Sequence, residues 1–155
     1  MKYILPFFIL LFSACSSVNN EVRAPFNSSQ AKSISSYARS LLGTPYKYGG
    51  NSPETGFDCS GFVDHVFRHT VGISLPRSTY QISRFGQAVS KSDLHTGDLV
   101  FFNTLHRKFS HVGIYLGSDR FIHSPSSGGE VRTEDMREAY WESHYDGARR
   151  VALRS

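Results

Sequence analysis

The spacing of hydrophobic residues changes part-way along the chain, from a helical period to a period of two. Hydrophobic positions three and four apart predict a helix over residues 33–42, and Gly43 ends it. Residues 44–57 are rich in Gly and Pro, which predicts a loop. We also expect a short helix within residues 77–85.

A second main helix is predicted from Cys59, with Asp58 as its N-cap and Gly72 as its stop. The apolar residues after Cys59 fall on one face: Phe62, Val63, Val66 and Phe67. The polar residues fall on the other face, which is expected to meet solvent: Asp64, His65, Arg68 and His69.

Strands are predicted in the second half of the chain. Residues 99–102 form a continuous apolar run, and residues 111–116 and 121–124 are expected to pair around a turn at 117–119. Further strands are expected at 131–133 and 151–153, and a short helix or irregular aromatic segment at 136–145. Because helices come first and antiparallel strands follow, the fold class is α+β.

The N-terminus has the pattern of a secretory signal. Lys2 precedes a ten-residue segment, residues 3–12, that is apolar except for one proline, and small residues lead to Cys15. The following stretch, to about residue 30, is rich in Ser and Asn and predicts a flexible tether. We therefore divide the chain into a signal peptide (1–14), an N-terminal tether (15–30) and one domain (31–155).

Composition limits the classes of protein to consider. The 155-residue chain has a net charge of +4, no apolar run long enough for a transmembrane helix, and two cysteines, too few for a disulfide framework. Its basic residues are spread along the chain instead of clustering among aromatics, so we expect no nucleic-acid partner. The positive charge suits an anionic surface.

Cys59 is the candidate nucleophile. It begins a helix, where unpaired N–H groups and the helix dipole favour the thiolate, so we expect a pKa below the free value of about 8.5. The alternative is a small buried hydrophobic residue.

His111 and His123 are the candidate partners of Cys59. With a three-residue loop at 117–119 the two imidazoles share one face of the hairpin, whereas a two-residue loop places them on opposite faces. If the Cys59 helix packs on the shared face, His111 is the base and His123 accepts its second ring N–H.

The other histidines are expected to be solvated. His65 and His69 lack the glutamate of a zinc-protease helix, and His95, His106 and His144 have polar neighbours in the sequence. We expect no metal site and no cofactor.

Several motifs in this chain resemble the NlpC family of bacterial cell-wall cysteine endopeptidases, which have a papain-like core. They extend from about Gly43 to Val151. The motifs are Gly43-Thr44-Pro45-Tyr46 with Gly49-Gly50, Asp58-Cys59-Ser60-Gly61-Phe62-Val63, Leu75-Pro76-Arg77-Ser78-Thr79, Gly97-Asp98-Leu99-Val100-Phe101-Phe102, His111-Val112-Gly113-Ile114-Tyr115 and Phe121-Ile122-His123. Tyr140-Trp141 and Ala148-Arg149-Arg150 resemble the lipoprotein branch of that family.

The resemblance implies roles for specific residues. It makes Cys59, His111 and His123 a catalytic triad, with the nucleophile helix packed on a central antiparallel sheet. It also implies that the Tyr46 hydroxyl and the Ser60 N–H bind the oxyanion. We expect substrate contacts from Asp58, Arg77 and Ser78, with Arg77 suited to the carboxylates of the substrate.

The segment Leu11-Phe12-Ser13-Ala14-Cys15 resembles a bacterial lipobox. That resemblance implies a lipidated Cys15 and, because Ser16 follows where an inner-membrane retention signal has Asp, anchoring in the outer membrane facing the periplasm. We expect a monomer held to the membrane through this anchor.

The expected function is hydrolysis of amide bonds in peptidoglycan stem peptides or their cross-links, through an acyl-enzyme. Two bonds remain open: γ-D-glutamyl-diaminopimelate within a stem, and the D-alanyl-diaminopimelate cross-link. The alternatives are a non-catalytic wall-binding lipoprotein and an acyltransferase on a related fold.

Overall fold

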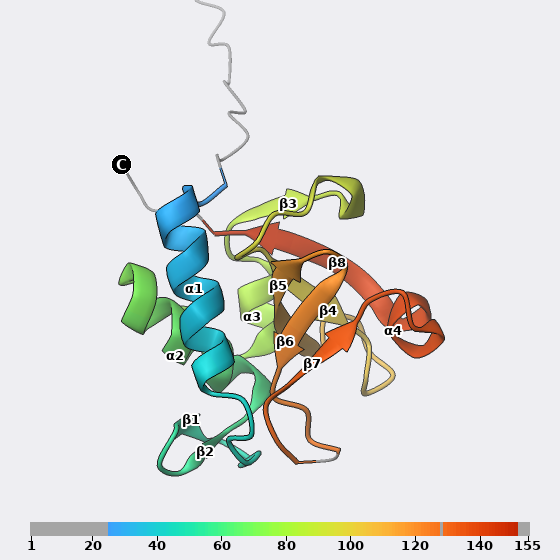
Figure 1. The fold of residues 1–155 in the computed structure, drawn as a ribbon. Helices are drawn as coiled ribbons and strands as arrows, with labels where there is room; N and C mark the ends of the chain where they lie inside the picture. Colours follow the sequence, from blue (N-terminus) through green and yellow to red (C-terminus); the bar gives the residue numbers. More distant parts are fainter. Residues whose placement is uncertain (1–24, 128, 152–155) are drawn as a thin grey trace, which may run out of the picture.

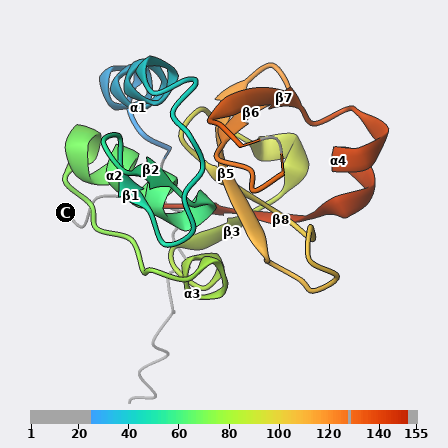
Figure 2. The ribbon, with the colours of Figure 1, turned by 90° about the horizontal axis from the view of Figure 1, so that it is seen from below.

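The computed structural model describes residues 25–127 and 129–151, which form a six-stranded antiparallel sheet with helices on both faces (Figures 1 and 2). The helices are α1 (Ser28–Ser40), α2 (Cys59–Val71), α3 (Thr79–Ser83) and α4 (Ala139–His144), with a 3-10 turn, η1 (Lys91–Asp93). The strands are, in spatial order, β3 (Gln87–Val89), β8 (Tyr145–Arg150), β4 (Leu99–Phe102), β5 (His111–Gly117), β6 (Arg120–His123) and β7 (Arg132–Asp135). A small hairpin pairs β1 (Asn51–Ser52) with β2 (Gly56–Phe57). The predicted α+β class is confirmed.

Helix α1 begins earlier than the predicted start at residue 33. Its N-cap is Asn27, whose side chain accepts a hydrogen bond from the Gln30 N–H at 2.9 Å, while the Gln30 side chain accepts one from the Asn27 N–H. This reciprocal cap satisfies two N–H groups of the first turn. The helix therefore includes the last residues of the range 15–30 that the sequence analysis assigns to a tether.

The predicted signal peptide, Cys15 and most of the tether lie outside the described residues. Within residues 25–127 and 129–151, no helix is both long enough and apolar enough to span a membrane.

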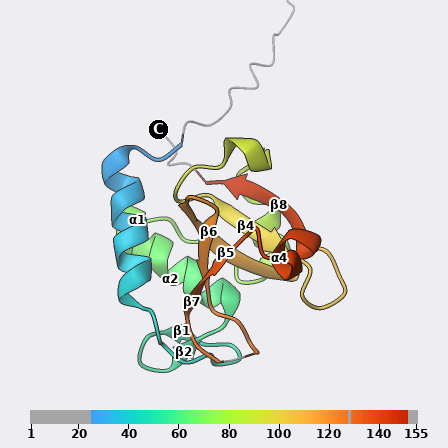
Figure 3. The same ribbon diagram turned by 45° about the vertical axis from the view of Figure 1, so that its right-hand side comes forward.

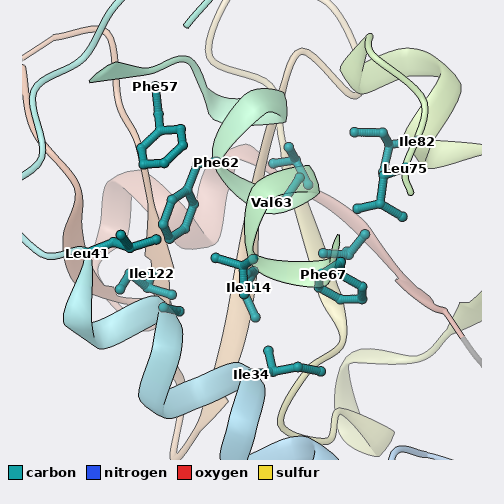
Figure 4. Close-up of a cluster of buried hydrophobic side chains, with 14 of the residues drawn as sticks. Ile34, Leu41, Phe57, Phe62, Val63, Phe67, Leu75, Ile82, Ile114 and Ile122 are labelled. Atoms are coloured by element: carbon teal, nitrogen blue, oxygen red, sulfur yellow. The ribbon is translucent and has the colours of Figure 1, made fainter. Parts of the chain in front are cut away.

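Helix α2 begins and ends where the sequence predicts. The Asp58 side chain accepts a hydrogen bond from the Gly61 N–H at 2.7 Å, and Gly72 takes the left-handed conformation with φ of 70°. Helix α2 lies between α1 and the sheet (Figure 3). On its apolar face, Phe62 and Phe67 pack with Ile34 of α1 and Ile114 of β5 in the larger hydrophobic cluster (Figure 4).

A second, smaller cluster covers the other face of the sheet. In this cluster, Phe121 of β6 and Trp141 of α4 pack against the face of β4 that is turned away from α2. Strand β4 contributes to both clusters, with Leu99 and Phe101 in the larger one and Val100 and Phe102 in the smaller one. Burial on both faces explains why residues 99–102 are continuously apolar.

Strands β3 and β8 are not predicted by the hydrophobic pattern. Strand β8 lies between β3 and β4 and ends at Arg150. Val151 is outside any strand, and the rest of the strand predicted at 151–153 lies outside the described residues. Arg150 is buried and donates to the Asp98 carboxylate at 2.9 and 2.8 Å. Because a charged residue takes an interior position, β8 lacks the apolar alternation of a half-buried strand.

Candidate active site

The β5–β6 hairpin places His111 and His123 on the same face of the sheet. Ile114 pairs with Ile122, which is the register that the sequence predicts, and it brings His123 opposite Gly113. The two histidines are then diagonal neighbours on the face that carries Trp141.

The turn of this hairpin differs from the prediction. It contains two residues, Ser118 and Asp119, with φ of 50° and 58°, and Gly117 pairs with Arg120. A two-residue loop was expected to separate the histidines. That expectation is wrong because Leu116 is an extra residue on β5, and this bulge restores the register.

The two imidazoles are hydrogen-bonded to each other. His111 Nε2 lies 2.6 Å from His123 Nδ1, and both side chains are buried. Burial lowers the pKa of His111 to about 3, with further lowering by the neighbouring His123 and Arg132. Burial also lowers the pKa of His123, although the nearby Glu134 carboxylate opposes this effect. Both rings are therefore neutral at pH 7.

Glu134 extends the pair, and no pattern in the sequence singles it out. Its Oε1 lies 3.5 Å from His123 Nε2 and 2.6 Å from Arg132 Nε. Hydrogen bonds from His123 and Arg132 lower the pKa of Glu134 to about 2, so it is an acceptor only. The register of β6 with β7, in which His123 pairs with Arg132, brings Glu134 there. No local sequence signal fixes that register across the intervening loop.

This chain of contacts determines which ring nitrogen is free. Because Glu134 only accepts, the neutral His123 donates from Nε2 and accepts at Nδ1. His111 must then donate from Nε2, which leaves its Nδ1 unprotonated. A neutral imidazole with a free Nδ1 lone pair can act as a base.

Cys59 is the first residue of α2 and is partly exposed. Burial raises the pKa of its thiol, and Asp58 adds to the rise, whereas the Thr79 hydroxyl and the N–H groups of Val112 and Ser60 lower it. The net shift is upward, which contradicts the expected low pKa. The position of Cys59 at a helix start predicts a low pKa, but it does not reveal that the sulfur is partly desolvated and lies near the Asp58 carboxylate.

The site forms at the beginning of β5 and not on a sheet face under α2. Helix α2 packs on the face of Val112 and Ile114, whereas His111 and His123 lie on the face of Trp141. The condition that α2 packs on the face of the two histidines is therefore not met. Cys59 and His111 line the same small cavity because His111 is the first residue of β5, next to Val112, whose N–H reaches the sulfur.

Among the described residues, three pockets adjoin one another at this site, and each neighbouring two share lining residues. The first, the Arg77 pocket, has a volume of about 600 Å³ and includes Tyr46 and Cys59. The second, the central cavity of about 60 Å³, is lined by Tyr46, Cys59 and His111. The third, the Trp141 pocket of about 300 Å³, includes His111 and Trp141. Cys59 therefore lies where the first two meet, and His111 where the last two meet.

Tyr46 and Ser60, the expected oxyanion donors, both lie beside the thiol. Tyr46 lines the Arg77 pocket and the central cavity, and burial and Cys59 raise the pKa of its hydroxyl. A protonated hydroxyl can donate to an oxyanion. The Ser60 N–H is close enough to the sulfur to lower the pKa of Cys59.

The three expected substrate-binding residues line the Arg77 pocket but have partners within the protein. Arg77 binds the Asp58 carboxylate with both Nη groups, at 3.0 and 2.7 Å, while Asp58 also caps α2. The Ser78 hydroxyl caps α3 by accepting from the Gln81 N–H at 3.2 Å. The contacts of these three residues with substrate stay a prediction, whereas their hydrogen bonds within the protein stabilise the starts of α2 and α3.

His65 is buried, so its expected place on a solvent face is wrong. Its Nε2 lies 2.9 Å from the Tyr37 hydroxyl of α1, and its ring lies against Phe57 and His69. Helix α1 covers this side of α2, which the period of α2 alone does not show. In the part of the chain that the structure describes, no group of three His, Cys, Asp or Glu side chains is placed to hold a metal ion.

Comparison with known families identifies the fold. The model of the NlpC/P60 family matches residues 43–150. The chain belongs to the NlpC/P60 family. The three residues predicted to form a triad, Cys59, His111 and His123, all lie inside the matched range. The family resemblance read from the sequence and the fold expected from it are thus confirmed.

Relatives within the NlpC/P60 family include cell-wall enzymes. The chain is 47% identical over 113 residues to the Escherichia coli protein named murein DD-endopeptidase MepS/murein LD-carboxypeptidase, covering 73% of this chain and 58% of that protein. It is 45% identical to the Escherichia coli murein DD-endopeptidase MepH, covering 71% of this chain and 42% of that protein. The chain thus spans about half the length of these two relatives. A Haemophilus influenzae protein named probable endopeptidase is 37% identical, with 92% of both chains covered.

Solved NlpC/P60 structures have the same fold. A Staphylococcus aureus protein described as similar to a lipoprotein of this family superposes with a TM-score of 0.77 at 35% identity, covering 87% of this chain and 45% of that one. The NlpC/P60 domain of the peptidoglycan hydrolase SagA gives a TM-score of 0.67 at 32% identity, covering 79% of this chain and 98% of that one.

Proposed function

We propose that this chain is a cysteine-type peptidoglycan endopeptidase that cuts amide bonds in stem peptides or their cross-links. The observation that carries the proposal is the central cavity, because it is lined by both a thiol at a helix start and a buried, hydrogen-bonded imidazole with a free Nδ1. The names of the NlpC/P60 relatives support the substrate class.

The reaction follows from these residues. As the Cys59 sulfur attacks the amide carbon, its proton passes to Nδ1 of His111, and the carbonyl oxygen becomes an oxyanion that Tyr46 and the Ser60 N–H stabilise. The C–N bond then breaks, the leaving nitrogen takes the proton from His111, and a thioester remains. Water, deprotonated by His111, hydrolyses the thioester and regenerates the thiol. Because thiol and imidazole are both neutral at rest, proton transfer accompanies the attack.

The test is digestion of purified sacculi, with mass spectrometry of the released muropeptides. Wild-type protein is expected to release products whose masses show addition of water at one amide, and Cys59→Ala is expected to release none while unfolding within a few degrees of wild type. Binding of sacculi without release would support the wall-binding alternative. Products that carry another nucleophile in place of water would support the acyltransferase.

We also propose that Cys15 is lipidated and that the protein is anchored in the outer membrane, on the basis of the lipobox-like segment before it. Wild-type protein is expected to incorporate labelled palmitate and to fractionate with outer membrane. Cys15→Ala is expected to lose the label and to accumulate unprocessed, whereas Cys59→Ala, the matched control, keeps it. An unlabelled wild-type protein with Met1 still in place would contradict this proposal.

A further inference from the structure

The direction of the proposed reaction assigns the two large pockets to different halves of the substrate. The leaving nitrogen takes its proton from His111, so the half of the substrate that departs must lie on the His111 side of the thiol. The Trp141 pocket is lined by His111 and not by Cys59, and the Arg77 pocket by Cys59 and not by His111. The acyl half therefore faces the Arg77 pocket, and the leaving half faces the Trp141 pocket.

Arg132 is the cation of the Trp141 pocket. Its side chain is 41% exposed and binds Glu134 through Nε at 2.6 Å. The two Nη groups have no hydrogen-bond partner among residues 25–127 and 129–151. The two Nη groups of a guanidinium can donate parallel hydrogen bonds to the two oxygens of one carboxylate.

Glu138 is the anion of the same pocket. It lies at the N-terminal end of α4, is exposed, and makes no side-chain cap to that helix. Glu134, the other carboxylate there, is occupied by His123 and Arg132. In the part of the chain that the structure describes, the Glu138 carboxylate makes no ion pair. A carboxylate beside an exposed aromatic ring, here the half-exposed Tyr140, suits an ammonium group.

We propose that the Trp141 pocket binds an amino-acid end whose α-carboxylate is free, with Arg132 on the carboxylate and Glu138 facing the nitrogen as it leaves and becomes an ammonium. The preferred bond is thus an amide whose nitrogen is carried by a carbon that also bears a free carboxylate. Within peptidoglycan this describes the D-alanyl-diaminopimelate cross-link or a C-terminal residue, and not the γ-D-glutamyl bond of an extended stem. This inference rests on the proposed function and names the substrate class of its leaving side.

The test compares two forms of one cross-linked muropeptide, in which the carboxyl group on the carbon bearing the scissile nitrogen is either free or a carboxamide. Wild-type protein is expected to cleave the free acid with a kcat/KM about 10- to 100-fold higher, the range of a charged hydrogen-bonded contact. Arg132→Met is expected to reduce this ratio to about one.

Glu134→Gln is the matched control, because it removes the negative charge that faces Arg132 but leaves the guanidinium. It is expected to lower kcat on both forms and to keep their ratio. A second control tests whether the position of Glu138 matters, and not only its charge. Free diaminopimelate, the amino acid that carries the leaving nitrogen, is added as an inhibitor. It is expected to bind Glu138→Gln more weakly than wild type and to bind Glu142→Gln with unchanged affinity, because Glu142 is an exposed neighbour on α4 that does not line the pocket.

The outcomes distinguish this inference from the proposed function. If wild-type protein releases muropeptides from sacculi but cleaves both forms equally, or if Arg132→Met keeps the wild-type ratio, the assignment of the pocket is wrong and the endopeptidase stands. If wild-type protein cleaves neither form and releases nothing from sacculi, the proposed function itself fails.

Discussion

Glu134 extends the proposed base, His111, into a chain of three hydrogen-bonded groups: His111, His123 and Glu134. Removing it with Glu134→Ala is expected to lower kcat by about 10- to 100-fold, the effect of losing a group that orients an imidazole through its second nitrogen. Glu134→Gln, which keeps an acceptor oxygen, should recover part of the loss. Steady-state kinetics across pH would check this, because the pKa of His123 loses the opposing effect of the carboxylate and falls further. Unchanged kcat and an unchanged pH profile would assign Glu134 a structural role only.

The two histidines should differ in importance. His111→Ala removes the base and the proton donor, so turnover should fall by at least about 10²- to 10⁴-fold. His123→Ala removes only the partner that fixes the tautomer, so its loss should be smaller, and His123→Gln should recover part of it. Kinetics on a defined muropeptide would measure the order. Equal losses for both alanine variants, with no recovery by glutamine, would mean that the roles are misassigned.

The thiol of Cys59 should be a slow nucleophile in the resting protein. Burial and Asp58 raise its pKa, so the thiolate fraction at pH 7 is lower than that of a free cysteine. Iodoacetamide is therefore expected to alkylate Cys59 more slowly than a model thiol at pH 7, with a rate that rises as pH increases. Mass spectrometry of the intact protein would follow the reaction. Faster alkylation than the model thiol would restore the low pKa expected from the helix start.

At the level of elements, local signals predicted the parts of the site that lie within one segment. Asp58 and Gly72 predicted the ends of α2. The assumed three-residue loop gave the observed β5–β6 register only because the Leu116 bulge compensates for the shorter turn. Signals that depend on distant pairing were missing. Strand β8 lacks an alternating apolar pattern because the charged Arg150 takes a buried position. Glu134 lies near His123 only because β6 pairs with β7.

Gly113 lets the β5 and β6 strands carry the histidines close together. A Cβ at Gly113 would lie 2.8 Å from the Phe121 ring, 2.9 Å from the Ile122 carbonyl oxygen and 3.2 Å from the His123 Cβ. Gly113→Ala is therefore expected to displace β6 and to lower kcat by about tenfold or more, because small misplacements of catalytic groups are costly.

Kinetics together with thermal unfolding would check the Gly113 variant, since overpacking should also cost about 1–3 kcal/mol of the free energy of unfolding. Wild-type kcat with wild-type stability would show that the hairpin tolerates the methyl group.

At the level of the whole molecule, the buried Asp98–Arg150 pair joins β8 to the beginning of β4. The side chains are 2% and 3% exposed, and Arg150 also donates to the Asp93 carbonyl at 2.8 Å. Arg150→Met leaves the Asp98 carboxylate buried without its partner and should cost about 3–5 kcal/mol of the free energy of unfolding. Arg137→Met, which breaks the exposed Arg137–Asp135 pair, should change it little. Urea unfolding would compare them, and equal stabilities would contradict the importance of the buried pair.

Helix α1 has a consequence for the reach of the enzyme from a membrane. The described chain enters at the start of α1, and the helix runs from there towards the end of the molecule where β1 and β2 lie, just before the nucleophile (Figures 1 and 3). Its 13 residues span about 20 Å at 1.5 Å per residue. If Cys15 carries a lipid, the length of α1 adds about 20 Å to the distance that the thiol can reach beyond the point where the chain enters the domain. Cys59 then lies towards the end of the domain opposite this entry point, which favours access to the mesh that the protein is proposed to cut.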